Sequence, residues 1–269
     1  MDREARRKSN REEQVRSIYR ALYRAWGAQH WWPARTRFEV IAGAYLTQNT
    51  AWTNVEHALA NLRLARVLSV SGIRRVPLGE LERLIRPSGY FRQKAKRLKN
   101  FVNFLDREYG GSLAKLLAQP THKLREELLS LNGIGPETAD SILLYAGNHP
   151  VFVVDAYTRR VLERHEIMPV GSDYEDIRQL FERALPAIAD QIDQNKDEDQ
   201  AGPSRPMLES GIRGAAHSPS PMSTSRRTAL AQVYNEMHGL IVGVGKNFCR
   251  KSQPHCDECP LQPYLPRPD

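Results

Sequence analysis

The sequence predicts an all-α protein, because apolar residues recur at helical spacing along most of the chain. The first stripe of this kind consists of Phe38, Ile41, Ala42, Tyr45 and Leu46. Steps of three and four residues place all of its members on one face of a helix. The run VFVV, residues 151–154, resembles a strand, but it is too short and isolated to build a sheet.

Five further stripes repeat this spacing in chain order and predict five more helices. They are Val55, Ala58, Leu59 and Leu62; Leu98, Phe101, Val102 and Leu105; Leu124, Leu128 and Leu131; Ile177, Leu180, Phe181 and Ala184; and Leu230, Val233, Tyr234, Met237, Leu240 and Ile241. The segment 194–227 interrupts the pattern, because it is rich in Pro, Ser, Gly and charged residues and has no periodic apolar face. We expect it to be a disordered insertion between two helices.

The composition favours a polyanionic partner. The chain has 269 residues, enough for one large or two modest domains, and its 39 Lys and Arg against 31 Asp and Glu give a formal charge of +8. No apolar run approaches the roughly 20 residues that span a bilayer. The first residues, MDREARRKSNREEQ, lack the apolar core of a signal peptide. We therefore expect no membrane association and a cytoplasmic, nucleoid-associated protein.

A glycine turn joins two predicted helices in LNGIGPETA, residues 131–139. Gly133 and Gly135 permit a tight hairpin, and Pro136 and Glu137 suit the first turn of the helix that follows. The backbone amides of such a hairpin, including that of Ile134, offer a phosphate-binding site. An ordinary corner between two helices explains the glycines equally well.

This stretch resembles the helix-hairpin-helix motif of the endonuclease III superfamily of DNA glycosylases, in which a Gly/Pro-rich loop and a catalytic aspartate follow the hairpin. HPVFVVDAYTRRV, residues 149–161, resembles that loop. Residues 31–59 and 89–101 resemble the branch that includes helical 3-methyladenine glycosylases. The resemblance covers most of residues 31–192 and 229–264 and implies a two-domain helical fold.

The resemblance implies that Asp155 is the catalytic acid. A carboxylate there would stabilise the positive charge that develops on the sugar and would orient or deprotonate water. The residue type also suits an N-cap for the helix that begins AYTRRV, and the two roles are compatible. Bifunctional members carry a nucleophilic lysine in the slot that Glu137 occupies, so this chain is expected to be monofunctional. Glu137 then complements the helix dipole, or alternatively positions water.

Further residues acquire roles from the same resemblance. Gln48 matches the residue that fills the gap left by a flipped nucleotide, and a capping or turn amide after the preceding helix is the alternative. Trp31, Trp32 and Trp52 are candidates for the base pocket, since aromatic faces attract a cationic alkylated purine. Each tryptophan taken singly is better explained as core, but we expect at least one of the three to line the pocket.

A basic segment is expected to contact phosphates. Lys94, Lys96, Arg97 and Lys99 alternate with apolar residues that should face the core, so their charges are expected to face solvent. A solvated helix face without DNA contact is the alternative.

The C-terminal cysteines match part of a metal-binding pattern. Cys249, Cys256 and Cys259 have the spacing of the family's [4Fe–4S] loop, but Leu265 stands at the fourth cysteine position. We favour a cluster with three cysteine ligands. A cluster completed by another ligand, a zinc site and no metal are the alternatives. The spare donors considered are His238, His255 and Asp257.

Together these features predict two domains, one of residues 37–150 with the hairpin and a discontinuous one of residues 1–36 and 151–269. The expected function is a monofunctional DNA N-glycosylase, acting as a monomer on double-stranded DNA that contains a damaged base. Alkylated purines such as 3-methyladenine are the favoured substrate. The alternatives are a G·T or G·U mismatch glycosylase, an endonuclease III-like glycosylase/lyase, and a non-catalytic DNA-structure-binding protein.

Overall fold

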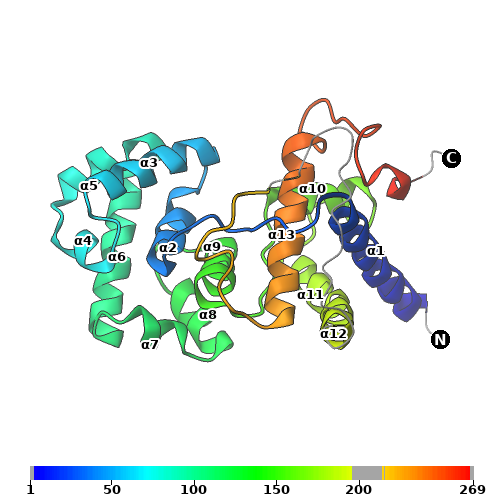
Figure 1. Cartoon of the computed structure of the whole chain (residues 1–269), viewed down its shortest axis with the longest axis horizontal. Coiled ribbons are helices and arrows are strands. Elements are labelled where there is room, and N and C mark those ends of the chain that lie inside the picture. Colours follow the sequence, from blue (N-terminus) through cyan, green and yellow to red (C-terminus); the bar gives the residue numbers. More distant parts are fainter. Residues whose placement is uncertain (1–2, 196–213, 215, 267–269) are drawn as a thin grey trace. The chain divides into compact units, whose positions relative to one another are not determined.

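A computed structural model of the chain describes residues 3–195, 214 and 216–266, and this part is built from helices without a strand (Figure 1). The all-α prediction is confirmed. Residues 151–154, which resemble a strand in the sequence, are buried and form neither a helix nor a strand, in agreement with the expectation that they build no sheet. No helix in the described part of the chain is both long and apolar enough to cross a membrane.

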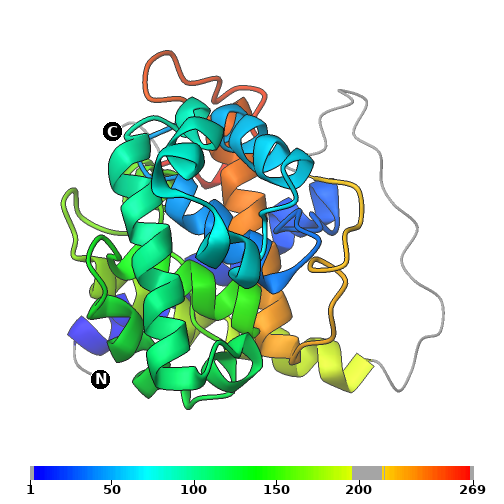
Figure 2. The same ribbon diagram turned by 90° about the vertical axis from the view of Figure 1, so that its left-hand side faces the viewer.

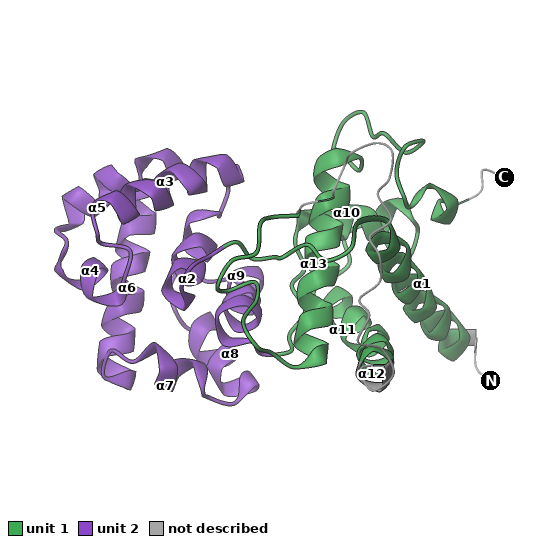
Figure 3. Ribbon diagram, viewed as in Figure 1, with its two compact units in different colours: residues 1–33, 150–269 green, residues 34–149 purple. Residues whose placement is uncertain are grey.

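The chain divides into two compact units, residues 1–33 with 150–269 (unit 1) and residues 34–149 (unit 2) (Figure 3). Unit 2 contains α2 (Arg37–Leu46), α3 (Trp52–Leu64), α4 (Val70–Arg75), α5 (Leu78–Leu84), η1 (Arg86–Ser88), α6 (Phe91–Tyr109), α7 (Leu113–Leu117), α8 (Thr121–Leu129), α9 (Pro136–Ser141) and the π-helical turn η2 (Ile142–Ala146). Unit 1 contains α1 (Arg3–Trp26), α10 (Ala156–Arg164), α11 (Tyr174–Ala184), α12 (Pro186–Asn195), α13 (Ala229–Asn247) and η3 (Gln262–Tyr264).

Unit 2 is built around α2 and α6. Nine of the ten residues of α2 are buried, and Thr36 begins this helix by accepting a hydrogen bond from the backbone N–H of Glu39. The longer α6 packs against α2, α4, α5 and α7 (Figure 2). It ends at Gly110, whose left-handed φ of 60° stops the helix at little cost.

Unit 1 is built around α13, which packs against α1, α10 and α12 (Figure 1). Because three of its neighbours are helices, almost every residue from Val233 to Gly245 is buried. The extended segment 151–154 enters this core through Phe152, whose ring stacks on Phe181 at 4.0 Å and meets Tyr234 edge-on at 5.9 Å. This packing fixes the chain immediately before α10.

The expected insertion at 194–227 falls partly outside the described residues, which exclude 196–213 and 215. In its described part, 216–227, the prediction of disorder is wrong. The backbone N–H of His217 donates to the carbonyl of Gln29 at 3.1 Å, and the His217 ring lies 5.4 Å from that of Trp31. Met222 and Ser223 are buried. The segment has no helical periodicity, and it packs as an irregular loop against the residues before α2.

Candidate active site

Asp155 lies at the junction between the buried segment 151–154 and α10. It is the N-cap of α10, as its residue type predicts, and its Oδ1 accepts hydrogen bonds from the Thr158 N–H at 2.7 Å and the Thr158 hydroxyl at 2.9 Å. Its other oxygen, Oδ2, lies 3.5 Å from Nε2 of His238 on α13, and the Asp155 side chain is 13% exposed. One oxygen therefore anchors the residue, and the other faces a buried imidazole.

The surroundings of Asp155 favour its ionised form. Burial by itself raises the pKa of this carboxyl, but attraction to His238 and the hydrogen bonds from His238 and Thr158 outweigh burial, so the pKa lies below its ordinary value of 3.8. A carboxylate in this position is charged at neutral pH and does not need a proton to be removed before it acts.

Aromatic rings surround this pair within unit 1. The Trp31 ring lies 6.2 Å from the His238 ring and 5.7 Å from the Trp32 ring, in edge-on arrangements. Phe152 meets His238 on another side at 6.5 Å. The Lys246 ammonium lies 5.7 Å from the Trp31 ring centroid, which is a cation–π contact. Trp31 and Trp32 are both buried, so they belong to the core as well as to the neighbourhood of Asp155.

The glycine hairpin lies in unit 2, between α8 and α9. Gly133 has a left-handed φ of 84°, and a β-carbon at this position would overlap the side chain of Arg97. Gly135 is the N-cap of α9 and is exposed. The expectation that Ile134 offers an outward amide is wrong, because its N–H donates to the Leu131 carbonyl at 3.1 Å and its side chain is buried. That hydrogen bond closes the turn.

Gln48 lies against this hairpin. Its Nε2 donates to the Gly133 carbonyl at 2.9 Å and to the Thr138 hydroxyl at 3.0 Å, and its Oε1 accepts from Arg97 at 2.8 Å. The hydrogen bonds of Gln48 therefore stabilise the hairpin, and Arg97 holds the Gln48 side chain in place. Insertion of Gln48 into a duplex stays a prediction, and it would require these three hydrogen bonds to break.

The expectation that Lys94 faces solvent as a phosphate ligand is wrong. The side chain is buried, and its Nζ donates to the carbonyls of Leu46 at 2.9 Å and Ser88 at 2.7 Å. Burial, with a smaller effect from the neighbouring Arg97, lowers the pKa of Lys94 to about 8. Lys94 therefore ties the end of α2 to η1.

The other basic residues of α6 divide by exposure. Lys96 is exposed and is placed as expected for a solvent-facing cation. Lys99 donates to the carbonyls of Arg74 and Val76, so its ammonium holds the end of α4. In the same unit Glu137 is exposed in the first turn of α9, and Trp52 is half-buried at the start of α3.

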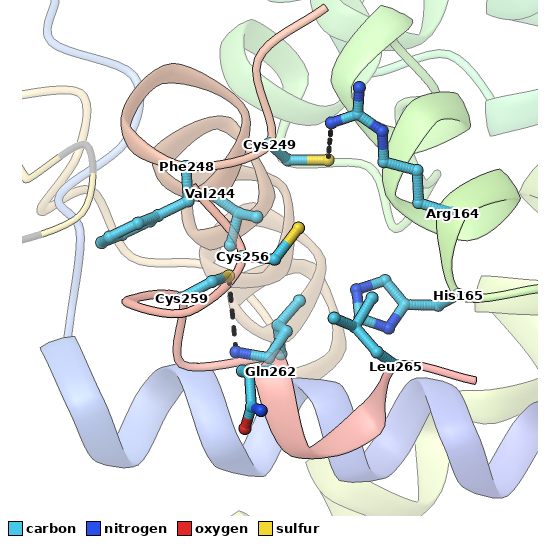
Figure 4. Close-up of a pocket in the computed structure, with 10 residues that line it drawn as sticks. Arg164, His165, Val244, Phe248, Cys249, Cys256, Cys259, Gln262 and Leu265 are labelled. Atoms are coloured by element: carbon cyan, nitrogen blue, oxygen red, sulfur yellow. Dashed lines mark hydrogen bonds between the residues drawn. The ribbon is translucent and has the colours of Figure 1, made fainter. Parts of the chain in front are cut away.

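The three cysteines line one pocket at the C-terminal end of α13, with a cavity volume of about 20 Å³ (Figure 4). All three are free thiols. The other lining residues include Arg164, His165, Val244, Phe248, Leu261, Gln262 and Leu265. Burial raises the pKa of the Cys259 thiol to about 11, and its N–H contact from Leu261 only partly offsets that rise.

The cysteine pocket lacks the geometry of a site for a single metal ion. Within the described residues, no three His, Cys, Asp or Glu side chains converge closely enough to hold one metal ion. A zinc site, whose ligands all lie about 2.0–2.3 Å from one ion, therefore does not fit. An iron–sulfur cluster holds its thiolates on separate irons and so spreads them further apart. The three thiols that line this pocket are the ligand type that such a cluster uses.

The sequence did not predict the contacts of two residues at these sites, His238 and Arg97. The sequence suggests His238 only as a spare metal donor, although a polar residue within the buried stripe from Leu230 to Ile241 is a signal of a buried polar contact. Arg97 was expected to face solvent, and nothing in the spacing indicated that it reaches Gln48 and the hairpin.

Comparison with known proteins identifies the family of the chain. Residues 42–187 match the family described as HhH-GPD superfamily base excision DNA repair protein. The chain is 40% identical to MJ1434 of Methanocaldococcus jannaschii, whose name describes a DNA repair glycosylase, over 96% of this chain and 98% of that one.

Two of the solved structures that are similar to the chain illustrate the likeness. The 3-methyladenine DNA glycosylase of H. pylori bound to 1,N6-ethenoadenine is 27% identical, with a TM-score of 0.64 over 88% of this chain and 97% of that one. A trapped endonuclease III–DNA covalent intermediate is 19% identical, with a TM-score of 0.68 over 94% and 95% of the two chains, which is a likeness in fold. The resemblance to the endonuclease III superfamily is confirmed.

Proposed function

The chain belongs to the HhH-GPD superfamily of base excision DNA repair proteins, and from that premise we propose that it is a monofunctional DNA glycosylase for alkylated purines. The observation that carries the proposal is the buried Asp155–His238 pair beside the rings of Trp31 and Trp32. It combines a carboxylate that stays ionised with aromatic surface, the two features that this hydrolysis requires.

Asp155 acts on the sugar of the damaged nucleotide. As the bond between C1′ and the base nitrogen breaks, its electron pair leaves with the base and positive charge develops on the sugar. The carboxylate stabilises that charge and accepts a proton from the water that adds to C1′. The products are a free base and an abasic site. His238 positions Oδ2 for this role, while Thr158 holds Oδ1.

The absence of a lysine at position 137 supports water as the nucleophile. A lyase forms a Schiff base through an amine, and the carboxylate of Glu137 cannot form one. Glu137 complements the positive end of α9 or positions water near the hairpin.

Cationic purines such as 3-methyladenine fit this chemistry. They leave as neutral bases once the bond breaks, so the enzyme needs no acid to protonate the leaving group. Tryptophan faces attract cationic rings, and Trp31 already accepts such a contact from Lys246. The H. pylori protein that the chain resembles is named for the same substrate class.

The partner is duplex DNA, bound by one copy of the chain. The chain carries a formal charge of +8, and we propose that the exposed Lys96 and the hairpin amides of Gly133 and Gly135 contact phosphates. Gln48 and Trp52 act where the damaged nucleotide leaves the stack, Gln48 as the wedge and Trp52 as aromatic surface.

An iron–sulfur cluster on Cys249, Cys256 and Cys259 is part of the proposal. When bound, it would cross-link the cysteine loop and hold Arg250 and Lys251, which are exposed, in a fixed position. Excision itself needs only the residues around Asp155.

The test is excision from labelled duplexes that carry, separately, a 3-methyladenine-type lesion, G·U, G·T or thymine glycol. Each reaction is read with and without hot alkali. We expect strand breaks from the alkylated duplex only after alkali, and we expect Asp155→Asn to lower excision at least 100-fold while duplex binding is retained. An unchanged excision rate in Asp155→Asn would refute the catalytic role.

The other outcomes identify the alternatives. Release from G·T or G·U alone would mean a mismatch glycosylase. Breaks without alkali would mean a lyase, and Lys246, next to Trp31, would then be the first lysine to replace. Binding to an abasic duplex without release of any base would mean a non-catalytic DNA-structure-binding protein.

A further inference from the structure

A histidine lies on the wall of the cysteine pocket opposite the thiols. His165 is the residue that follows α10, and it lines the pocket together with Cys249, Cys256 and Cys259. Its side chain is buried, and Figure 4 shows its ring pointing into the space between Cys256 and Leu265. The histidine therefore comes from a segment far from the cysteine loop in sequence, which is why spacing did not reveal it.

The ring of His165 is held as metal-binding histidines usually are. Its Nδ1 lies 3.0 Å from the carbonyl of Tyr264, an acceptor that requires a proton on Nδ1. In a neutral imidazole with Nδ1 protonated, Nε2 carries the lone pair. A carbonyl behind the ring fixes both tautomer and orientation, and this is the outer contact that metal-bound histidines commonly make.

The other candidate donors do not reach the pocket. Leu265 stands at the fourth cysteine position of the family pattern and contributes only an apolar wall. His255 and Asp257 are exposed on the cysteine loop and do not line the pocket. His238 faces Asp155. Of the histidines and carboxylates in the described residues, His165 is the one that lines the pocket.

The sulfur atoms receive hydrogen bonds of the kind that stabilise bound thiolates. Arg164 donates from Nη1 to Cys249 Sγ at 3.2 Å, and the Leu261 N–H approaches Cys259 Sγ at 3.5 Å. Hydrogen bonds to the sulfur atoms tune iron–sulfur clusters. Two of the three cysteine sulfur atoms therefore make the kind of contact that cluster ligands make.

We propose that His165 is the fourth protein ligand, through Nε2, of an iron–sulfur cluster held by Cys249, Cys256 and Cys259. Histidine replaces cysteine on iron in Rieske centres, so the exchange of ligand type is chemically sound. The inference rests on the cluster proposed above, but it is independent of the substrate and of Asp155.

The experiment uses the full-length chain, reconstituted without oxygen with iron and sulfide, and compares it with His165→Asn. An asparagine amide can still donate to the Tyr264 carbonyl, so this variant keeps the Nδ1 contact and loses the nitrogen ligand. We expect about four irons per chain in the wild type and about three in His165→Asn. Circular dichroism shows whether the variant keeps its helical content.

Pulsed electron paramagnetic resonance of the dithionite-reduced protein, labelled with 15N-histidine, tests the bond directly. We expect 15N coupling in the wild type, none in His165→Asn, and unchanged coupling in the control His255→Asn, which alters an exposed histidine on the cysteine loop. The double variant His165→Asn with Leu265→Cys supplies a cysteine at the family position and should recover the fourth iron without 15N coupling.

Three results would overturn the proposal: no iron–sulfur absorption in the reconstituted wild type, a cluster without 15N coupling, or coupling that persists in His165→Asn. Excision from the alkylated duplex is measured on the same samples. Loss of excision in Asp155→Asn with an intact cluster signal separates the fate of the proposed function from that of this ligand.

Discussion

Asp155 uses its two oxygens for different purposes. Oδ1 accepts two hydrogen bonds from Thr158 and fixes the side chain at the start of α10. Oδ2 points to His238 on α13, a residue that lies 83 positions later in the sequence. The cap makes the position of the carboxylate rigid, and the imidazole offsets the cost of burying its charge. The residue type of Asp155 predicted the cap. Its contact with the His238 imidazole results from the packing of α13 and could not be predicted from the residue type.

Replacing His238 should therefore shift the acid limb of excision. Because the folded-state pKa of Asp155 lies below 3.8, the wild type should lose activity only as pH falls through that lowered value. In His238→Phe, burial is opposed by Thr158 alone, so the acid limb should move to higher pH. His238→Gln keeps an N–H donor without the charge and should lie between the two.

The measurement is kcat/KM between about pH 2.5 and pH 7 on the alkylated duplex, with the exposed-residue variant His57→Gln as control. A positioning role predicts the order wild type, His238→Gln, His238→Phe in rising apparent pKa. Acid limbs that coincide in all three proteins would show that His238 only fills space. The free energy of unfolding should depend on pH in the same direction. The stabilising contribution of Asp155 is present above pH 3.8 and is lost as pH falls through its lowered folded-state pKa.

At the scale of secondary-structure elements, α6 shows where pattern reading succeeds and where it fails. Its stripe of Leu98, Phe101 and Leu105 is buried, as the spacing predicts. Lys94 lies four residues before Leu98 and therefore falls on the same stripe, so its burial was readable from the sequence. The charge of Lys94 favours a solvent-facing position, whereas its spacing from Leu98 favours burial, and the structure agrees with the spacing. The carbonyls that receive its ammonium come from other elements and had no signal at all.

The buried ammonium predicts a pH-dependent stability. The folded chain releases the Lys94 proton above about pH 8, whereas the unfolded chain holds it until about 10.5. Between those values the unfolded state binds more protons, so stability should rise with pH by roughly 3 kcal/mol or less. Lys94→Met should lack this contribution.

Urea unfolding of wild type and Lys94→Met at pH 7 and pH 10 measures the effect. Other titrating groups contribute equally to both proteins and cancel in the difference. We expect the stability of Lys94→Met relative to wild type to fall on going to pH 10. A difference that stays constant would mean that the ammonium is solvated in the folded protein.

For the molecule as a whole, the sequence predicted the helical class and the helix-hairpin-helix but not the environment of each site. Periodicity and glycine position are local signals, so α2, α3, α6, α8, α11 and α13 and the turn at Gly133 could be read directly. The contacts of His165 with the cysteine pocket and of His238 with Asp155 join segments more than 80 residues apart. Nothing in single-sequence spacing encodes such pairs, and the irregular loop 216–227 had no periodic signal to reveal its packing.

The formal charge of +8 predicts that duplex affinity depends on salt, and α6 carries a matched pair of lysines to test how local that effect is. Fluorescence anisotropy of a labelled undamaged duplex between about 50 and 200 mM KCl gives the slope of log K against log salt. Each phosphate contact contributes about 0.9 to that slope, so Lys96→Gln should reduce its magnitude by about 1. Lys94→Met removes the same formal charge from the same helix but from a buried position, so its slope should equal that of the wild type. Equal reductions in both variants would mean that net charge alone governs binding, and no change in Lys96→Gln would mean that α6 does not contact the DNA backbone.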